Sequence, residues 1–175
     1  MNEREPIERV RFDDADIIFK HFGGEKDNFH TEGQRDFCIK IDEEEAHYLM
    51  DKGLNVKPLT SRDPDEPPMF YVKVKLKYGV RDDGTEWGPI INVYTDKVKR
   101  VFKEKDVTKL DRARILDADV VTHIYRRQNN GKPTATLTLD ILHAVIKERT
   151  YDDPYANKYA SYMETEIGNP DGCPF

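Results

Sequence analysis

Apolar and polar residues alternate without interruption from Met69 to Tyr78. Successive side chains of a β-strand point to opposite faces, so every second residue shares a face. One face of this segment is apolar or aromatic, whereas the other carries Tyr71, Lys73, Lys75 and Lys77. The pattern therefore predicts a strand that packs on a core and presents one tyrosine and three lysines outward.

Shorter apolar runs, separated by turn-forming residues, predict further strands along the chain. We expect them over residues 9–22 with a bend near 13–14, 36–41, 56–59, 90–95, 120–127 and 134–146. A turn over residues 129–132 would join the last two strands as a hairpin. We expect loops over residues 25–34 and 61–68, and an irregular basic segment over 96–116 with a short helix near 108–112.

Residues 42–53 have the signature of a helix. Asp42 is a suitable N-cap, and the three glutamates after it lie where the helix dipole favours negative charge. Ala46, Leu49 and Met50 form the expected buried stripe, and Gly53 marks the expected end. A second, weaker helix is predicted over residues 153–163, followed by a disordered terminus.

Short strands, one clear helix and many turns favour a mostly β fold. We predict an OB-like Greek-key antiparallel barrel with one inserted helix, and a β-sandwich is the alternative that the pattern leaves open. The OB-like domain would span residues 1–149. Residues 150–175 would form an acidic C-terminal helix and a flexible tail.

The chain of 175 residues, 37% hydrophobic and 35% charged, has the size of one domain with a densely charged surface. No apolar run approaches the roughly 18 residues that span a bilayer. The N-terminus lacks an apolar signal segment, and two cysteines do not make a disulfide framework. We therefore predict a cytoplasmic protein with no membrane partner.

The net charge of −6 hides an uneven distribution. Residues 69–149 hold 17 Lys and Arg against 11 Asp and Glu, a net charge of +6. Residues 1–68 and 150–175 are acidic, with net charges of −8 and −4. A basic middle segment can bind an anionic partner, although a charged surface can also vary by segment without any function.

Motifs for catalysis are missing from the sequence. The chain has no glycine-rich phosphate loop, no nucleophile elbow and no helical pair of metal-binding histidines. His21, His30 and Cys38 come nearest to a set of metal ligands, but their spacing matches no zinc pattern. We predict no catalytic site, no metal and no cofactor.

The lysines of residues 69–78 favour a nucleic-acid site. An anionic strand laid across Lys73, Lys75 and Lys77 would relieve their mutual repulsion, and aromatic rings beside them would stack on bases. Other strands and one turn offer further candidates, namely Tyr94, Tyr125, Arg126, Arg127 and Trp87. Two alternatives stay open: the lysines protect a sheet edge from aggregation, and Trp87 folds back over the core.

The segment 19–37 interleaves four phenylalanines with basic residues. Its elements Phe22-Gly23-Gly24, Phe29, Gly33 and Arg35-Asp36-Phe37 resemble those of phage-encoded single-stranded DNA-binding proteins. The acidic helix start 42–45 and the segment 55–59 continue the resemblance, which covers most of residues 9–146. It implies an OB-type fold that binds single strands during phage replication or recombination, with Phe22, Phe29 and Arg35 at the site. Where this family often has Asn, the chain has His21.

The C-terminus is similar to the tails of bacterial single-stranded DNA-binding proteins, which end in acidic residues, an apolar residue, Pro and Phe. Here Asp171, Pro174 and Phe175 take these places. The similarity implies a tail that recruits replication or recombination proteins, and an ordinary C-terminus is the alternative.

We therefore expect a non-catalytic protein that binds single-stranded DNA with little sequence preference and supports phage DNA replication or recombination. The alternative is a phage protein that does not bind DNA and modulates a host factor through its acidic surface.

Overall fold

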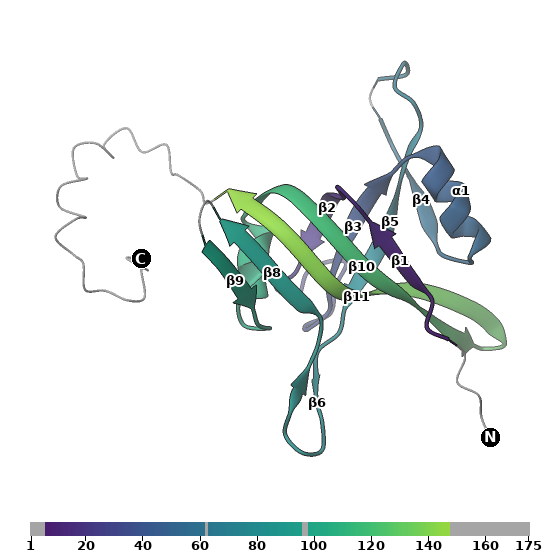
Figure 1. Cartoon of the computed structure of the whole chain (residues 1–175). Coiled ribbons are helices and arrows are strands. Elements are labelled where there is room, and N and C mark those ends of the chain that lie inside the picture. Colours follow the sequence, from purple (N-terminus) through teal and green to yellow (C-terminus); the bar gives the residue numbers. More distant parts are fainter. Residues whose placement is uncertain (1–5, 62, 96–97, 148–175) are drawn as a thin grey trace, which may run out of the picture.

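The computed structural model describes residues 6–61, 63–95 and 98–147. The predicted helix over 153–163 and the tail residues Asp171, Pro174 and Phe175 lie outside the described residues. Among the described residues, no helix is long and apolar enough to cross a membrane. Strands dominate the rest, as the alternation predicts (Figure 1).

The first half of the described chain holds six elements and the second half seven. The first six are β1 (Arg9–Phe12), β2 (Asp16–His21), β3 (Arg35–Ile41), α1 (Glu43–Asp51), β4 (Val56–Leu59) and β5 (Met69–Leu76). The others are β6 (Gly79–Val80), β7 (Glu86–Trp87), β8 (Ile90–Thr95), β9 (Val98–Phe102), the 3-10 helix η1 (Val107–Asp111), β10 (Arg114–Asn129) and β11 (Lys132–Lys147).

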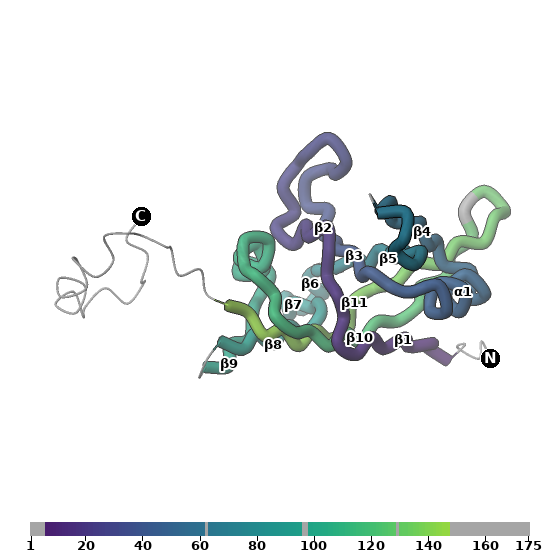
Figure 2. Tube along the Cα trace, turned by 90° about the horizontal axis from the view of Figure 1, so that it is seen from above, coloured from purple at the N-terminus to yellow at the C-terminus, as the bar shows by residue number. Residues whose placement is uncertain are grey.

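The main sheet closes on itself. Its strands follow the order β1-β10-β11-β5-β3-β2, and β1 continues directly into β2 along the chain (Figure 2). A bend at residues 13–15 separates the two, and there the Ala15 N–H donates to the Ala118 carbonyl at 2.7 Å. When β1 and β2 are counted as one bent strand, the barrel has five strands. They close in the order β1/β2, β3, β5, β11, β10 and back to β1/β2, which is the order 1-2-3-5-4-1 when the five strands are numbered along the chain. This closed path confirms the predicted OB-like barrel and excludes the sandwich.

Two pairings of the main sheet are parallel, one within the barrel and one beside it, which the predicted antiparallel barrel did not include. β11 pairs in parallel with β5 at residues 137–138 and with β8 at residues 141–145. Two long connections make this possible, because parallel neighbours need a crossover between them. β8 and β9 extend the sheet beyond the barrel, and β9 replaces part of the segment that was predicted to be irregular.

The core lies inside the barrel and takes side chains from every barrel strand. Phe37, Val74, Leu137 and Val120 are buried. The predicted cap of α1 is confirmed, since the Asp42 carboxylate accepts from the Glu45 N–H at 2.8 Å.

The predicted burial of Met50 is wrong, because this side chain is 39% exposed while Ala46 and Leu49 are buried. α1 packs along a narrow stripe, and Met50 lies about 100° around the helix from Leu49.

Candidate nucleic-acid interface

The strand that carries the lysines is an interior strand of the barrel. β3 pairs with β5 from Arg35 opposite Leu76 to Ile41 opposite Phe70, and β4 and β11 pair with its other side. The interpretation of the lysines as edge protection is therefore wrong, since β5 has no free edge along most of its length. The alternation itself is confirmed, because Val72, Val74 and Leu76 point into the core.

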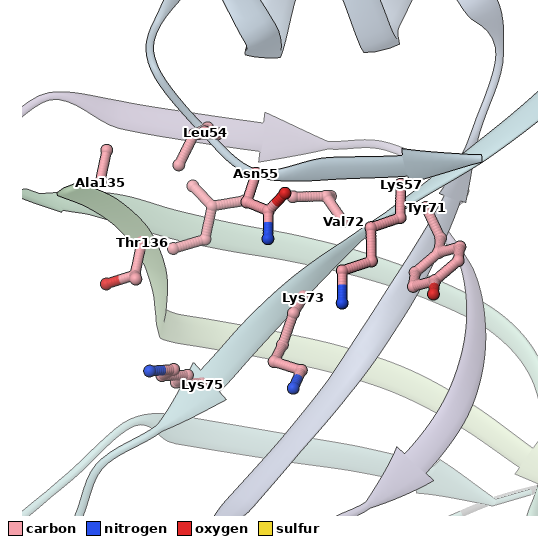
Figure 3. Close-up of a pocket in the computed structure, with 10 residues that line it drawn as sticks. Leu54, Asn55, Lys57, Tyr71, Val72, Lys73, Lys75, Ala135 and Thr136 are labelled. Carbon is pink, nitrogen blue, oxygen red and sulfur yellow. The ribbon is translucent and has the colours of Figure 1, made fainter.

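A hollow of about 220 Å³ lies over the outer face of β5. Figure 3 shows Tyr71 at one end of it and Lys75 at the other, with Lys73 between them. β4 contributes Lys57 and β11 contributes Thr136 to the same lining. We call the surface formed by residues Lys40, Lys57, Tyr71, Lys73, Lys75 and Lys77 the lysine face.

Two lysines of this face were missed by sequence reasoning. Lys40 of β3 and Lys57 of β4 lie opposite Tyr71, one on each side. Directly opposed residues on paired strands share a face, so both lysines belong to the surface of Tyr71. The signal was hidden because each lysine stands alone in a short strand and gathers with the others only by strand pairing.

Phe19 is a further residue that the sequence analysis did not place at the site. Its backbone lies in the left-handed region, with φ of 49°, at an irregularity in the β2–β3 pairing. This conformation costs a bulky residue on the order of 1 kcal/mol or more. The ring is 59% exposed and meets the Tyr71 ring edge-to-face at 5.3 Å. The strained backbone thus places an exposed aromatic ring at the lysine face.

Tyr125 joins the same surface from β10. The Lys77 ammonium lies over its ring, 4.3 Å from the centroid, and the ring is 45% exposed. Tyr125 lies opposite Thr136, which lines the hollow. The structure therefore brings together Tyr125 and the predicted lysines.

The two arginines that follow Tyr125 differ. Arg126 points the other way, where its guanidinium donates to the Lys52 carbonyl at 2.9 Å and contacts the Glu8 carboxylate at 3.2 Å. Because these contacts turn Arg126 away from the lysine face, they correct its predicted place in the nucleic-acid site. Arg127 is exposed and shares the outward register of Tyr125.

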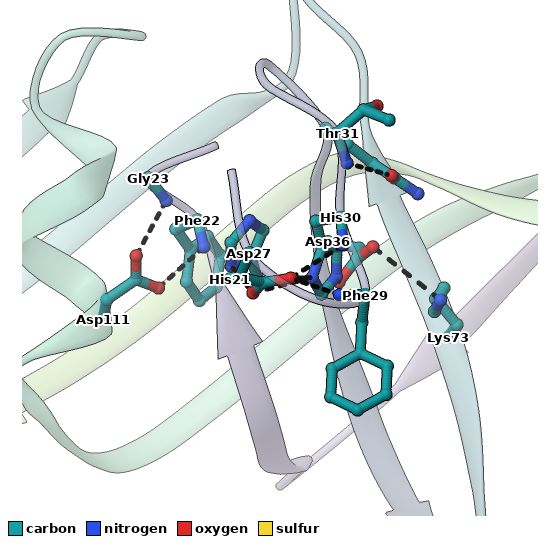
Figure 4. A network of polar contacts seen from close by, with 11 residues as sticks. His21, Phe22, Gly23, Asp27, Phe29, His30, Thr31, Asp36, Lys73 and Asp111 are labelled. Atoms are coloured by element: carbon teal, nitrogen blue, oxygen red, sulfur yellow. Dashed lines mark hydrogen bonds and ion pairs between the residues drawn. The ribbon is translucent and has the colours of Figure 1, made fainter. Parts of the chain in front are cut away.

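Phe22 cannot stack on a base, which corrects the expectation from the resemblance. Its ring is fully buried and stacks on Phe37 with centroids 5.0 Å apart. The Asp111 carboxylate accepts from the Phe22 and Gly23 N–H groups at 2.7 and 2.8 Å (Figure 4). A Cβ at Gly23 would lie 2.7 Å from Thr108 Oγ1, so glycine permits this close approach to η1.

Arg35 has a structural role in the described fold. Its guanidinium donates to the Phe22 carbonyl at 2.7 Å and lies 3.5 Å from the Glu104 carboxylate. It also lies over the Tyr78 ring at 5.7 Å, and only 17% of the side chain is exposed. These contacts hold the start of the loop 22–34 in place. Because they occupy the guanidinium within the protein, they correct the predicted contact of Arg35 with nucleic acid.

Phe29 lies on the loop between β2 and β3, which projects from the barrel (Figure 2). Asp27 shapes the loop, because its carboxylate accepts from the N–H groups of Phe29 and His30, each at 2.7 Å. The hydrogen bond from the Phe29 N–H is the main reason that the pKa of Asp27 is lowered. The Phe29 ring is 89% exposed, as a residue that stacks on bases requires.

Trp87 belongs to the small β6–β7 hairpin that projects from the barrel (Figure 1). It is 43% exposed, and a Cβ at Gly79 would lie 2.5 Å from its ring. The ring therefore packs on the backbone of its own projecting hairpin and not over the core, and its stacking on a base stays a prediction.

Tyr94 does not join the lysine face, which corrects its predicted place there. Its hydroxyl lies 3.1 Å from His143 Nδ1, and its strand partner is Val145. Lys75 pairs with Thr138, seven residues earlier on β11. At about 3.3 Å per residue, this separation is roughly 20 Å along the strand.

The model of one protein family, described as "Putative phage ssDNA-binding domain", matches residues 1–171. Among curated proteins, none matches the chain. Solved structures of the single-stranded DNA-binding protein from bacteriophage Enc34 are similar at 8–9% identity. The full protein gives a TM-score of 0.48 and covers 88% of this chain and 89% of its own. Its complex with ssDNA gives 0.47, with 82% and 89% covered.

Proposed function

The chain belongs to the phage ssDNA-binding domain family, and from this premise we propose that it binds single-stranded DNA across the lysine face with little dependence on base sequence. One observation carries the proposal: lysines of β4 and β5 line one hollow on an interior strand of the barrel, and Lys40 of β3 lies on the same face, opposite Tyr71. An interior strand needs no charges to protect it, so the gathered ammonium groups require another explanation.

Phosphates would supply the affinity. Lys57, Lys73 and Lys75 line one hollow, where they repel each other unless an anion neutralises them. A DNA strand that contacts them releases its condensed counterions, and this release drives binding at low salt. None of the lysines fixes the identity of a base, because phosphates are the same along the strand.

Exposed aromatic rings at the border of the hollow would hold the bases. Phe19 and Tyr71 form one pair, and Tyr125 lies beyond Lys77. Stacking on such rings accepts every base, since each base has a π-face. Phe29, on the projecting loop, would extend the stacking surface.

The proposed role needs no catalytic step. The protein would protect single strands during phage DNA replication or recombination in the cytoplasm of the bacterial host. The tail residues Asp171, Pro174 and Phe175 would recruit protein partners, with the terminal ring in an apolar pocket and the carboxylate on a basic side chain.

Fluorescence anisotropy with labelled 20-mers tests the proposal. We expect the full chain to bind oligo-dT and a mixed-sequence strand with affinities within a few-fold, and the duplex more weakly. If four of the five lysines of the lysine face contact phosphates, the logarithm of the association constant should fall with the logarithm of the salt concentration at a slope of about −2.8. Absence of binding at low salt, or equal affinity for single strand and duplex, would contradict the proposal.

A further inference from the structure

A compact polar cluster lies where the loop 22–34 meets β2 and β3 (Figure 4). The rings of His21 and His30 stack with centroids 3.8 Å apart and planes 14° apart. Their side chains are 13% and 15% exposed. Both imidazoles are mostly buried, and each lies within reach of the same carboxylate of the loop.

One carboxylate faces both rings. Asp27 Oδ1 lies 2.9 Å from His30 Nδ1, and Asp27 Oδ2 lies 3.5 Å from His21 Nδ1. One ligand atom from each of the three residues can be chosen so that all lie within 4.8 Å of one another. Atoms bound to one ion at about 2.1 Å lie at most about 4.2 Å apart, so a complete site requires these atoms to move closer and the two stacked rings to turn until their nitrogen lone pairs converge on the ion.

Asp36 fixes the orientation of His30. This residue is 2% exposed, and its Oδ1 lies 3.1 Å from His30 Nε2. An ionised carboxylate only accepts, so the Nε2–H of His30 donates to it and Nδ1 carries the lone pair in a neutral ring. That lone pair faces the oxygens of Asp27, which are also acceptors. The contact therefore requires a positive charge between the two groups.

His21 is available to share that charge. Its Nε2 is buried and has no hydrogen-bond partner among the described residues, and its Nδ1 makes only the long contact to Asp27. Protons on both rings would place two like charges 3.8 Å apart in a mostly buried position. A single positive charge avoids this repulsion, either as one proton on His30 or as one cation bound by both rings and the carboxylate.

We propose that His21, Asp27 and His30 bind one divalent transition-metal ion of the zinc type, with Asp36 as the outer carboxylate that orients His30. Two imidazole nitrogens and one carboxylate suit zinc and its neighbours, whereas magnesium and calcium prefer oxygen ligands. Ligating histidines commonly donate their other N–H to a carboxylate, as His30 does to Asp36.

The sequence predicted no metal because the spacing of the histidines matches no zinc motif. Strand pairing supplies what the spacing lacks, since His21 lies opposite Asp36 in the β2–β3 register. An ion here would tie the loop that carries Phe29 to both strands. Asp36 Oδ2 also lies 3.9 Å from Lys73 Nζ, so the site borders the lysine face.

Zinc binding by the untagged full-length protein tests the inference directly. After chelator treatment, we expect one zinc ion per chain by equilibrium dialysis, with an affinity measurable against a chromophoric chelator. H21Q and H30Q should each weaken zinc binding by at least about 10–100-fold, the usual cost of disturbing such a site. The matched control is H123Q, because His123 Nδ1 lies 2.7 Å from Asp140 Oδ1 without a second ring. It should bind zinc as the parent does.

Cobalt gives a readout that needs no variant. Bound in place of zinc, Co²⁺ should show the visible absorption of a four-coordinate site, and zinc should remove it. Absence of both zinc and cobalt binding by the folded parent protein would overturn the inference and leave a proton on His30 as the positive charge. Equal losses in H21Q, H30Q and H123Q would also overturn it. These readouts do not involve DNA, so the proposed function can fail while the metal site stands.

Discussion

Two regions along β11 carry the same residue types and differ in what surrounds them. Near Thr138, Lys77 lies over Tyr125, and near Val145, Lys99 lies over Tyr94 at 6.0 Å. The first pair borders the hollow lined by further lysines. We call the second region, formed by β8, β9 and the end of β11, the far region.

The far region carries the cations Lys99 and Arg100 on β9, but it borders an acidic hollow. Tyr94 and His143 share a hollow there with Asp117 and Asp119. These carboxylates crowd Asp14, whose pKa is raised mainly by its hydrogen bond to Asp117. Phosphates would meet more negative charge at this place. A tyrosine beside a lysine therefore favours a nucleic-acid site where the adjoining hollow is lined by lysines, and less so where it is lined by carboxylates.

The most severe change distinguishes the buried core from an exposed ring of the proposed site. Phe22→Ala should lower the free energy of unfolding by about 3–5 kcal/mol, because it leaves a cavity next to Phe37. Phe29→Ala should leave stability unchanged, since its ring is 89% exposed, and weaken oligo-dT binding. Urea unfolding and anisotropy measure the two effects. A stable Phe22→Ala variant with weakened DNA binding would return Phe22 to the site.

Removing charge from each region tests the comparison itself. The triple variant K73A/K75A/K77A should bind oligo-dT about 100-fold more weakly at 0.1 M salt and flatten the salt slope by about 2. The matched variant K99A/K103A/K105A removes the same charge from exposed residues of β9 and the turn after it. It should change the affinity little, because long-range attraction is screened within about 10 Å. Equal losses in both variants would mean that net charge alone drives binding.

The strained Phe19 allows stability and binding to be separated. Phe19→Gly should weaken oligo-dT binding by about 1–3 kcal/mol, because it removes a stacking ring. The same change relieves a backbone at φ 49°, so thermal stability should stay level or rise. Tyr94→Ala, in the far region, is the control and should keep full affinity. A Phe19→Gly protein that binds normally would show that the ring only covers Tyr71.

The smallest expected effect concerns the C-terminal residues 164–175. The described chain ends at Lys147, beside the far region, and the residues after it are acidic (Figure 1). Their deletion should leave the affinity for oligo-dT equal or slightly higher at low salt, and the difference should vanish at high salt. The same deletion should abolish capture of replication or recombination partners. Much weaker DNA binding would place these residues in the binding surface.

Much of the fold could be predicted because local patterns specify it. Alternation over residues 69–76 fixed which side of β5 is buried, and Asp42 marked the start of α1. Turn residues at 129–132 indicated the β10–β11 hairpin. The break between β1 and β2 was expected as a bend, although its role in closing the barrel was not visible.

The candidate site was predicted in part. The lysines of β5 and Tyr125 were identified because aromatic and basic residues stand out in a strand. Phe22 and Arg35 were misplaced, because a phenylalanine and an arginine in a loop look the same whether they bind a ligand or fasten the loop. The structure distinguishes the two roles, because the ring of Phe22 is buried and the guanidinium of Arg35 is hydrogen-bonded to the Phe22 carbonyl.

The alternation of side chains, the start of the helix and the basic middle of the chain follow from the sequence alone. These properties depend on neighbours a few residues apart, whose spacing the backbone geometry fixes. The pairing of the strands makes β5 an interior strand of the barrel wall, puts Lys40 and Lys57 on either side of Tyr71, and sets His21 opposite Asp36. Those relations depend on which strands pair and in which register, and pairing is settled by burial of the whole core rather than by any one segment.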